Sequence, residues 1–75
     1  MNNKRRELIK CNISMLENIK TNIEGILSDE EMNFDNMPEN LQSSIRGEES
    51  ESAIEILNEV IEDLDICINS LTEIV

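Results

Sequence analysis

The sequence predicts an all-α fold: an antiparallel helical hairpin of two long helices that pairs into a four-helix-bundle homodimer. Apolar residues recur every three or four positions on both sides of a central segment, which is the spacing of one helical face. That central segment holds the only Pro and the only Phe of the chain. Because 75 residues provide at most one small core, we interpret residues 1–75 as a single helical-hairpin domain.

The first helix is predicted over about residues 4–31. Its apolar stripe alternates steps of three and four residues, and no Pro interrupts it. The stripe consists of Ile9, Ile13, Leu16, Ile19, Ile23 and Ile26. We interpret this stripe as the inward face of the helix, whereas Met15 points sideways and suits contact with a partner.

The connector is predicted over about residues 32–44 as a compact turn rather than a flexible linker. Asn36 stands three residues before Glu39, and Pro38 lies between them. This arrangement predicts that Asn36 caps a short helical turn over about residues 38–42.

The start of the second helix is a candidate ligand site. Ser44 is the expected N-cap, and Gly47 falls in the first turn, where its cost is small. Helix N-termini favour anions, and the guanidinium of Arg46 matches carboxylate or phosphate. The hypothesis is that an anionic small molecule binds Asn40, Ser43, Ser44, Arg46 and Gly47. The alternative is that these residues only reverse the chain and that Arg46 pairs with a nearby carboxylate.

The second helix, predicted over about residues 45–74, has the clearest pattern in the chain. Seven-residue units beginning at Ala53, Val60 and Cys67 each repeat an apolar residue, an Ile and then a Leu. Three apolar positions per heptad form a stripe wider than one partner helix covers. We therefore predict a homo-oligomer, dimer or higher. The predicted oligomer interface consists of Ala53, Ile54, Leu57, Val60, Ile61, Leu64, Cys67, Ile68 and Leu71.

Charge is strongly negative and unevenly distributed along the chain. The formal net charge is −11, with five basic and three acidic residues over 1–28 and nine acidic and no basic residues over 48–75. This charge argues against direct nucleic-acid binding. We expect an antiparallel hairpin to place the basic residues 4–10 beside the acidic residues 63–73.

The available residue types disfavour catalysis. The chain has no His, two isolated Cys and no Gly-rich phosphate loop, so neither a zinc site nor a nucleophile–base pair can be assembled. We predict a non-enzymatic protein with no cofactor and no bound metal. Carboxylates at Glu59, Glu62 and Asp65 have the spacing of magnesium-dependent hydrolases, but the first helix provides no matching pair.

Two cysteines, Cys11 and Cys67, are too few for a disulfide framework. No apolar run approaches the ~20 residues that span a bilayer, and no apolar run follows the basic residues 4–6 as in a secretory signal. We therefore expect a cytoplasmic protein with no membrane partner.

The connector contains a more specific pattern. Residues 34–42 read Phe-Asp-Asn-Met-Pro-Glu-Asn-Leu-Gln, and residues 44–48 read Ser-Ile-Arg-Gly-Glu. With its flanking helices, the chain resembles a group of short acidic phage and prophage proteins of Gram-positive bacteria, whose function is unassigned. That group has Phe-Asp-Asn-Leu-Pro-Glu-Asn/Ser-Leu-Gln followed by Ser-Glu-Arg-Gly-Glu, and this chain departs from it at Ile45. The resemblance implies a phage or prophage setting, in which very small non-enzymatic proteins often block a host factor.

Three functional hypotheses follow, with a magnesium-dependent hydrolase as a fourth. The first is a phage- or prophage-encoded oligomeric interaction protein that inhibits or sequesters a host defence or regulatory component. The second is a trap that sequesters a small anionic ligand, such as a nucleotide, at the connector. The third is an acidic mimic of nucleic acid, whose carboxylates imitate phosphates on a nuclease or repressor. These carboxylates are Glu55, Glu59, Glu62, Asp63 and Asp65.

Overall fold

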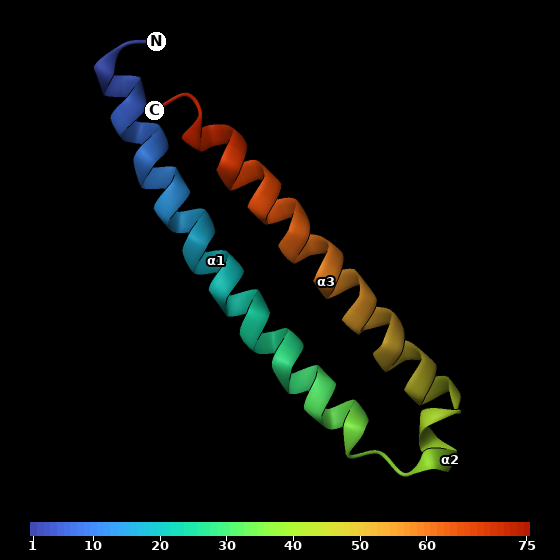
Figure 1. The fold of residues 1–75 in the computed structure, drawn as a ribbon. Coiled ribbons are helices and arrows are strands. Elements are labelled where there is room, and N and C mark those ends of the chain that lie inside the picture. Colours follow the sequence, from blue (N-terminus) through green and yellow to red (C-terminus); the bar gives the residue numbers. More distant parts are fainter.

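In a computed structural model, which describes all 75 residues, the chain forms an antiparallel helical hairpin. The long helices α1 (Asn3–Asp35) and α3 (Ile45–Thr72) pack against each other, and the short helix α2 (Glu39–Gln42) lies between them in the chain. Figure 1 shows that both termini lie at one end of the hairpin and that α2 closes the other end. The prediction of an all-α helical hairpin is confirmed.

The hairpin is a narrow rod. Its principal extents are 58 × 15 × 13 Å, and its radius of gyration is 17.1 Å. A compact domain of this length has a radius of gyration of roughly 11 Å. Two helices side by side form a single layer, so each long helix has one neighbour and leaves its remaining sides uncovered.

The first helix is longer than the sequence predicts. It continues to Asp35, because no residue before Pro38 opposes helix formation, and Pro disfavours helical conformation at the residue before it. The N–H of Asn36 donates to the Met32 carbonyl (3.0 Å). Asn36 is thus the C-cap of α1, and the expectation that it caps α2 is wrong. The N-cap of α2 is Pro38, which makes no side-chain cap hydrogen bond.

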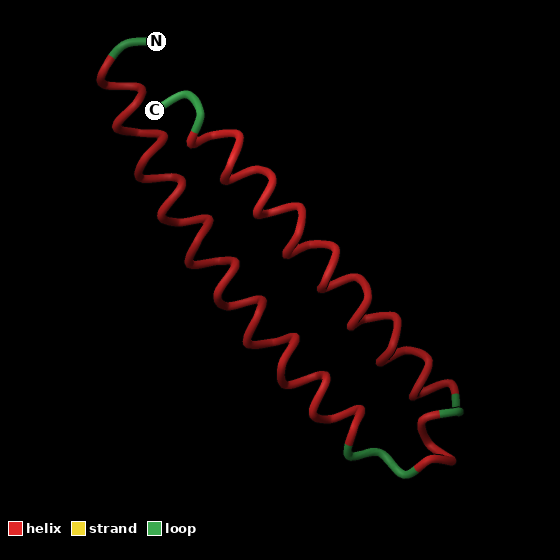
Figure 2. The backbone as a smooth tube through the Cα atoms, in the orientation of Figure 1, coloured by secondary structure: helices red, strands yellow, loops and turns green.

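Both long helices begin at a side-chain cap. The Asn2 side chain accepts a hydrogen bond from the Arg5 N–H (2.9 Å), and the Ser44 hydroxyl accepts one from the Gly47 N–H (3.4 Å). Each cap satisfies one of the free N–H groups at a helix start. The expected role of Ser44 is confirmed, and Figure 2 shows the short loops on either side of α2.

The seam between α1 and α3 is apolar but thin. Of the 75 residues only Gly47, Ser50 and Ile68 are buried, and Ile68 is the only large apolar side chain among them, at 8% exposed. The other seam residues are half-buried. They are Ile9, Ile13, Leu16, Ile23, Leu27 and Phe34 of α1 and Ile54, Leu57, Ile61, Leu64 and Leu71 of α3. One helix therefore covers only part of each stripe.

Two residues expected on the inward face of α1 lie outside the seam. Ile19 is 46% exposed and Ile26 is 57% exposed, whereas their neighbours Lys20 and Leu27 are half-buried. The spacing from Leu16 and Ile23 permits either neighbour at a helical repeat of 3.6 residues. The long seam follows an average step of about 3.5 residues, and this selects Lys20 and Leu27.

Candidate functional site

The connector is held to both long helices through Gln42. Its side-chain amide donates to the Phe34 carbonyl in the last turn of α1 (3.0 Å). Its backbone packs against Gly47 in the first turn of α3. One residue of α2 thus joins the end of α1 to the start of α3.

Gly47 is buried because the backbone of α2 passes directly over it. A Cβ atom at this position would lie 2.6 Å from the Gln42 Cα and closer still to the Gln42 carbonyl group. No side chain fits there without movement of the backbone. The sequence identified Gly47 as a helix-start residue, but the close approach that requires glycine is visible only in the structure.

A buried polar contact joins the long helices next to the connector. The hydroxyl of Ser50, which is 5% exposed, donates to the carboxylate of the half-buried Glu30 (2.7 Å). A hydrogen bond to an ionised acceptor is stronger than one between neutral groups. This contact sets the register of α1 against α3 at the closed end.

The residues of the predicted ligand site do not converge on one point. The Ser43 hydroxyl donates to the Glu39 carbonyl (3.0 Å), the Ser44 hydroxyl donates to the Leu41 carbonyl, and Asn40 is exposed. Gly47 is covered by α2. These side chains thus serve the turn itself, and the ligand hypothesis for the full set remains a prediction.

Arg46 alone of that set lines a cavity. A shallow hollow of about 240 Å³ at the end of the hairpin is lined by Asn33, Asn36, Met37, Pro38, Leu41 and Arg46. Arg46 is exposed and forms no ion pair within the chain, so the alternative pairing with a nearby carboxylate is not formed. Sequence reasoning missed Asn33 and Asn36, because they belong to the end of α1, which was expected to stop earlier.

One long side of the hairpin, the acidic side, is defined by Glu17, Glu24 and Glu31 of α1 and Glu51 and Asp65 of α3. Lys20 forms an ion pair with Asp65 across this side (2.7 Å). The hydrogen bond that Lys20 donates to the Asp65 carboxylate raises the pKa of Lys20 above its ordinary value, and the charges of Asp65, Glu24 and Glu17 act in the same direction. A second shallow hollow is shared by Glu31 and Glu51. These contacts place the acidic flanks of both helices on the same side.

The opposite long side is apolar. Measured from the seam, about 100° per residue puts four exposed residues of α1 on the flank away from Glu17 and Glu24. These are Leu8 (56% exposed), Met15 (54%), Ile19 (46%) and Ile26 (57%). The corresponding flank of α3 lies away from Glu51 and Asp65 and contains Ala53, Ile56, Val60, Cys67 and Ile74. We call these nine residues the apolar side.

The predicted oligomer interface divides between the seam and the apolar side. Its Ile and Leu members, Ile54, Leu57, Ile61, Leu64, Ile68 and Leu71, are buried or half-buried within the chain. Its remaining members lie on the apolar side, where Cys67 is exposed and Ala53 and Val60 are half-buried. Sequence reasoning missed Leu8 of α1 as an interface candidate and placed Ile19 and Ile26 on the inward face. The available signal was their spacing of seven, four and eleven residues from Met15, which suits contact with a partner.

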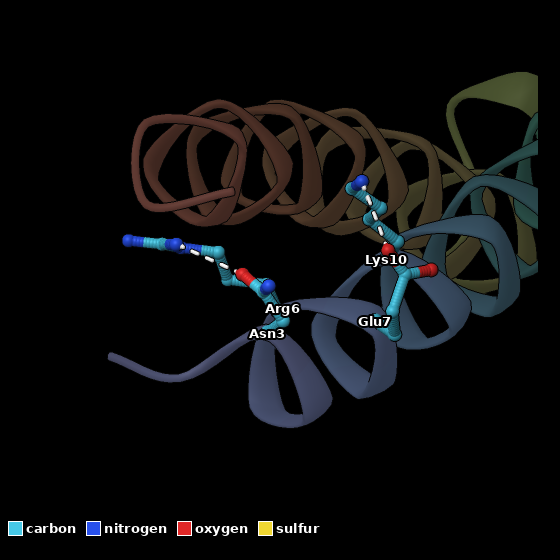
Figure 3. Close-up of polar contacts among 4 residues, drawn as sticks. All are labelled: Asn3, Arg6, Glu7 and Lys10. Carbon is cyan, nitrogen blue, oxygen red and sulfur yellow. Dashed lines mark hydrogen bonds and ion pairs between the residues drawn. The ribbon is translucent and has the colours of Figure 1, made fainter.

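The basic residues near the N-terminus make local contacts only. Figure 3 shows Arg6 donating to the Asn3 side chain (3.3 Å) and Lys10 pairing with Glu7 (3.2 Å) on the same helix. No residue of segment 4–10 forms an ion pair with α3. The ion pairs expected between residues 4–10 and 63–73 are therefore not formed, and Asp65 pairs with Lys20 instead.

The carboxylates of the proposed nucleic-acid mimic are mostly unpaired. Glu55, Glu59, Glu62 and Asp63 are exposed and form no ion pair, whereas Asp65 binds Lys20.

No three His, Cys, Asp or Glu side chains lie close enough together to hold a metal ion. Cys11 and Cys67 are both free and exposed. Neither long helix contains a stretch apolar enough to cross a membrane.

Comparison with known proteins finds no match for this chain: it matches no protein-family model, no curated protein and no solved structure.

Proposed function

We propose that this chain is a non-enzymatic, oligomeric interaction protein that lays its apolar side against helical partners. In the phage or prophage setting that the connector motif suggests, its partner is a host defence or regulatory component, which the hairpin inhibits or sequesters. The observation that supports this proposal is the uncovered apolar side, whose Leu8, Met15, Ile19 and Ile26 are each about half exposed or more. A contiguous exposed apolar surface typically marks an interaction site.

The arrangement of this surface suits helical partners. Its residues recur at helical spacing along two helices that lie side by side, so a shallow apolar strip runs along the hairpin between α1 and α3. An amphipathic helix, or a pair of helices, can lay its own apolar stripe into such a strip. The acidic side cannot serve in this way, because burying its unpaired carboxylates would carry a large desolvation cost.

The proposal is tested by a matched pair of variants. Met15→Lys places a charge on the apolar side, whereas Ile66→Lys makes a similar change at an exposed Ile (63%) that lies off this side. Tagged wild type, Met15→Lys and Ile66→Lys are used to capture proteins from a Gram-positive host lysate, and each is expressed in that host during phage challenge.

We expect one host protein to be retained by the wild type and by Ile66→Lys and lost by Met15→Lys. We expect protection of the phage from host defence to follow the same order. A captured set and a plating efficiency that are identical for all three chains would refute the proposal.

A second candidate function is supported by Arg46. Its guanidinium has no carboxylate partner and lines a hollow with the amides of Asn33 and Asn36. These groups could hold a small anion, and an unpaired guanidinium is suited to carboxylate or phosphate.

Calorimetry with a panel of nucleotides tests this function, using Arg46→Ala and, as a control, Arg5→Ala at the opposite end. Loss of the Arg46 contact should weaken binding by about 1.5–3 kcal/mol, and Arg5→Ala should not. Equal affinities for the two variants would reject the site.

A further inference from the structure

We infer that the occupant of the apolar side is a second copy of this chain, packed face to face with its connector at the opposite end. The inference deepens the proposed function and rests on it, since it names a partner for the same surface. Three observations carry it: a spacing that reads the same in both directions, a one-sided distribution of charge, and an excess of exposed area.

The exposed apolar residues of α1 are spaced symmetrically. Leu8, Met15, Ile19 and Ile26 are separated by seven, four and seven residues. A two-fold axis between Met15 and Ile19 therefore stacks Leu8 of one copy on Ile26 of the other, and Met15 on Ile19. Such self-complementarity is what a two-fold symmetric interface requires.

The apolar residues on the flank of α3 are spaced symmetrically about the same two-fold axis. Ala53, Val60, Cys67 and Ile74 recur every seven residues, so their midpoint lies between Val60 and Cys67. The Ser50–Glu30 hydrogen bond puts residues whose numbers add to about 80 at the same level of the two helices. The midpoint between Val60 and Cys67 therefore lies level with residue 17, the middle of the α1 stripe. One axis across the hairpin thus stacks α1 on α1 and α3 on α3, each antiparallel, and completes a four-helix bundle.

Charge selects the antiparallel orientation. When the hairpin is divided at the level of the two-fold axis, the connector half, residues 18–63, holds thirteen acidic and two basic residues, a net charge of −11. The other half, residues 1–17 and 64–75, holds four basic and four acidic residues and is neutral. A dimer with both connectors at one end would place two strongly negative halves together, whereas the antiparallel dimer places each beside a neutral half.

The same orientation provides partners for the unpaired basic residues. Lys4 and Arg5 form no ion pair within the chain. The two-fold axis that stacks Leu8 on Ile26 brings them toward residues 29–31 of the second copy, which are all acidic. Opposite charges at the rim of an interface favour one orientation and accelerate association.

The exposed area matches the size of such an interface. The chain exposes 5648 Å², whereas a compact monomer of 8.6 kDa exposes roughly 4,700 Å². The excess is roughly 950 Å², and a standard interface covers about 800 Å² of each partner. Pairing through the apolar side would therefore bring the exposed area of each chain to the ordinary value for its mass.

Sedimentation equilibrium of the full chain tests the stoichiometry. We expect the wild type to have twice the chain mass of 8.6 kDa and Ile19→Lys, beside the axis, to raise the dimer dissociation constant by about 30-fold or more. Ile66→Lys is the matched control, because it makes the same change off the apolar side and should alter the constant by about threefold at most. Ile26→Lys replaces Ile19→Lys if circular dichroism shows that the latter has lost helix. A monomeric wild type would overturn the inference.

Disulfide formation between single-cysteine chains tests the orientation. In chains with Cys11→Ser and Cys67→Ser, an equimolar mixture of Leu8→Cys and Ile26→Cys should form the mixed dimer about tenfold faster than a mixture of Leu8→Cys and Ile74→Cys. The reverse preference would mean that both connectors lie at the same end and would overturn the antiparallel dimer.

The two proposals fail separately in these experiments. A monomeric chain whose capture of a host protein is still abolished by Met15→Lys would overturn the second copy as occupant and leave the interaction function standing. A dimer that cross-links as expected but neither retains a host protein nor protects phage would sustain the inference and refute the host-directed function.

Discussion

The closed end of the hairpin and the middle of α1 each contain one glycine, and the two differ completely in surroundings. A Cβ atom on Gly47 would collide with the Gln42 backbone, whereas a Cβ atom on Gly25 would meet nothing within 4 Å. Gly47 lies where three helices meet, and Gly25 lies on a helix with one neighbour. The comparison indicates that this molecule concentrates its specific contacts at the connector.

The rest of the hairpin is held more loosely. Along the body the seam consists of half-buried aliphatic side chains and one ion pair between the helices. At the connector, Gln42 binds the end of α1 and Ser50 binds Glu30. We therefore expect substitutions at the connector to cost more stability than comparable substitutions in the body.

The largest effect is expected for Gly47→Ala. The added methyl group forces α2 away from α3 and breaks the contacts of Gln42, which should lower the free energy of unfolding by about 2–3 kcal/mol. Urea unfolding followed by circular dichroism at fixed protein concentration measures the change. An unchanged midpoint would show that α2 can move at no cost and would remove the contrast with the body.

Ser50→Ala should have the next largest effect. It removes a buried donor from the Glu30 carboxylate, and the loss should be about 1–2 kcal/mol. Ser52→Ala is the control, because Ser52 is exposed on the same helix. Equal unfolding midpoints for the two variants would contradict a role for the Ser50–Glu30 contact in joining the helices.

Gly25→Ala should stabilise the protein. Alanine favours helix over glycine by up to about 1 kcal/mol, and the structure offers no clash to offset this gain. The midpoint of thermal unfolding should rise, in contrast to Gly47→Ala. A fall in the midpoint would mean that the outer side of α1 is covered by something that this single chain does not include.

The smallest effect is expected for the Lys20–Asp65 ion pair at high pH. Because folding raises the pKa of Lys20 above its ordinary value of 10.5, the ion pair stabilises the fold fully below that pH and ceases to do so as the pH rises through the folded-state value. Asp65→Asn should therefore be less stable than the control Glu62→Gln at neutral pH and equal to it at strongly alkaline pH. A difference that persists unchanged through this range would exclude the ion pair as its cause.

Much of this architecture follows from local patterns. The heptads of the second helix, the Ser44 cap and the segment around Pro38 predict two long helices and a short turn, since each depends only on residues close in the chain. The end of α1 was misplaced because acidic and amide residues before Pro38 neither favour nor break a helix strongly. The same error kept Asn33 and Asn36 out of the predicted ligand site, because both residues lie at this end of α1.

What the sequence alone determined is the periodicity: which residues of each helix share a face. What only the tertiary structure decided is which face meets the other helix. Helical spacing alone allows either Ile19 or Lys20, and either Ile26 or Leu27, to lie in the seam. The pairing of α1 with α3 places Lys20 and Leu27 there and leaves Ile19 and Ile26 exposed. The need for glycine at residue 47 also arises from the tertiary structure. It results from the close approach of the Gln42 backbone of α2 to the first turn of α3, and the spacing of apolar side chains along either helix does not report such a contact.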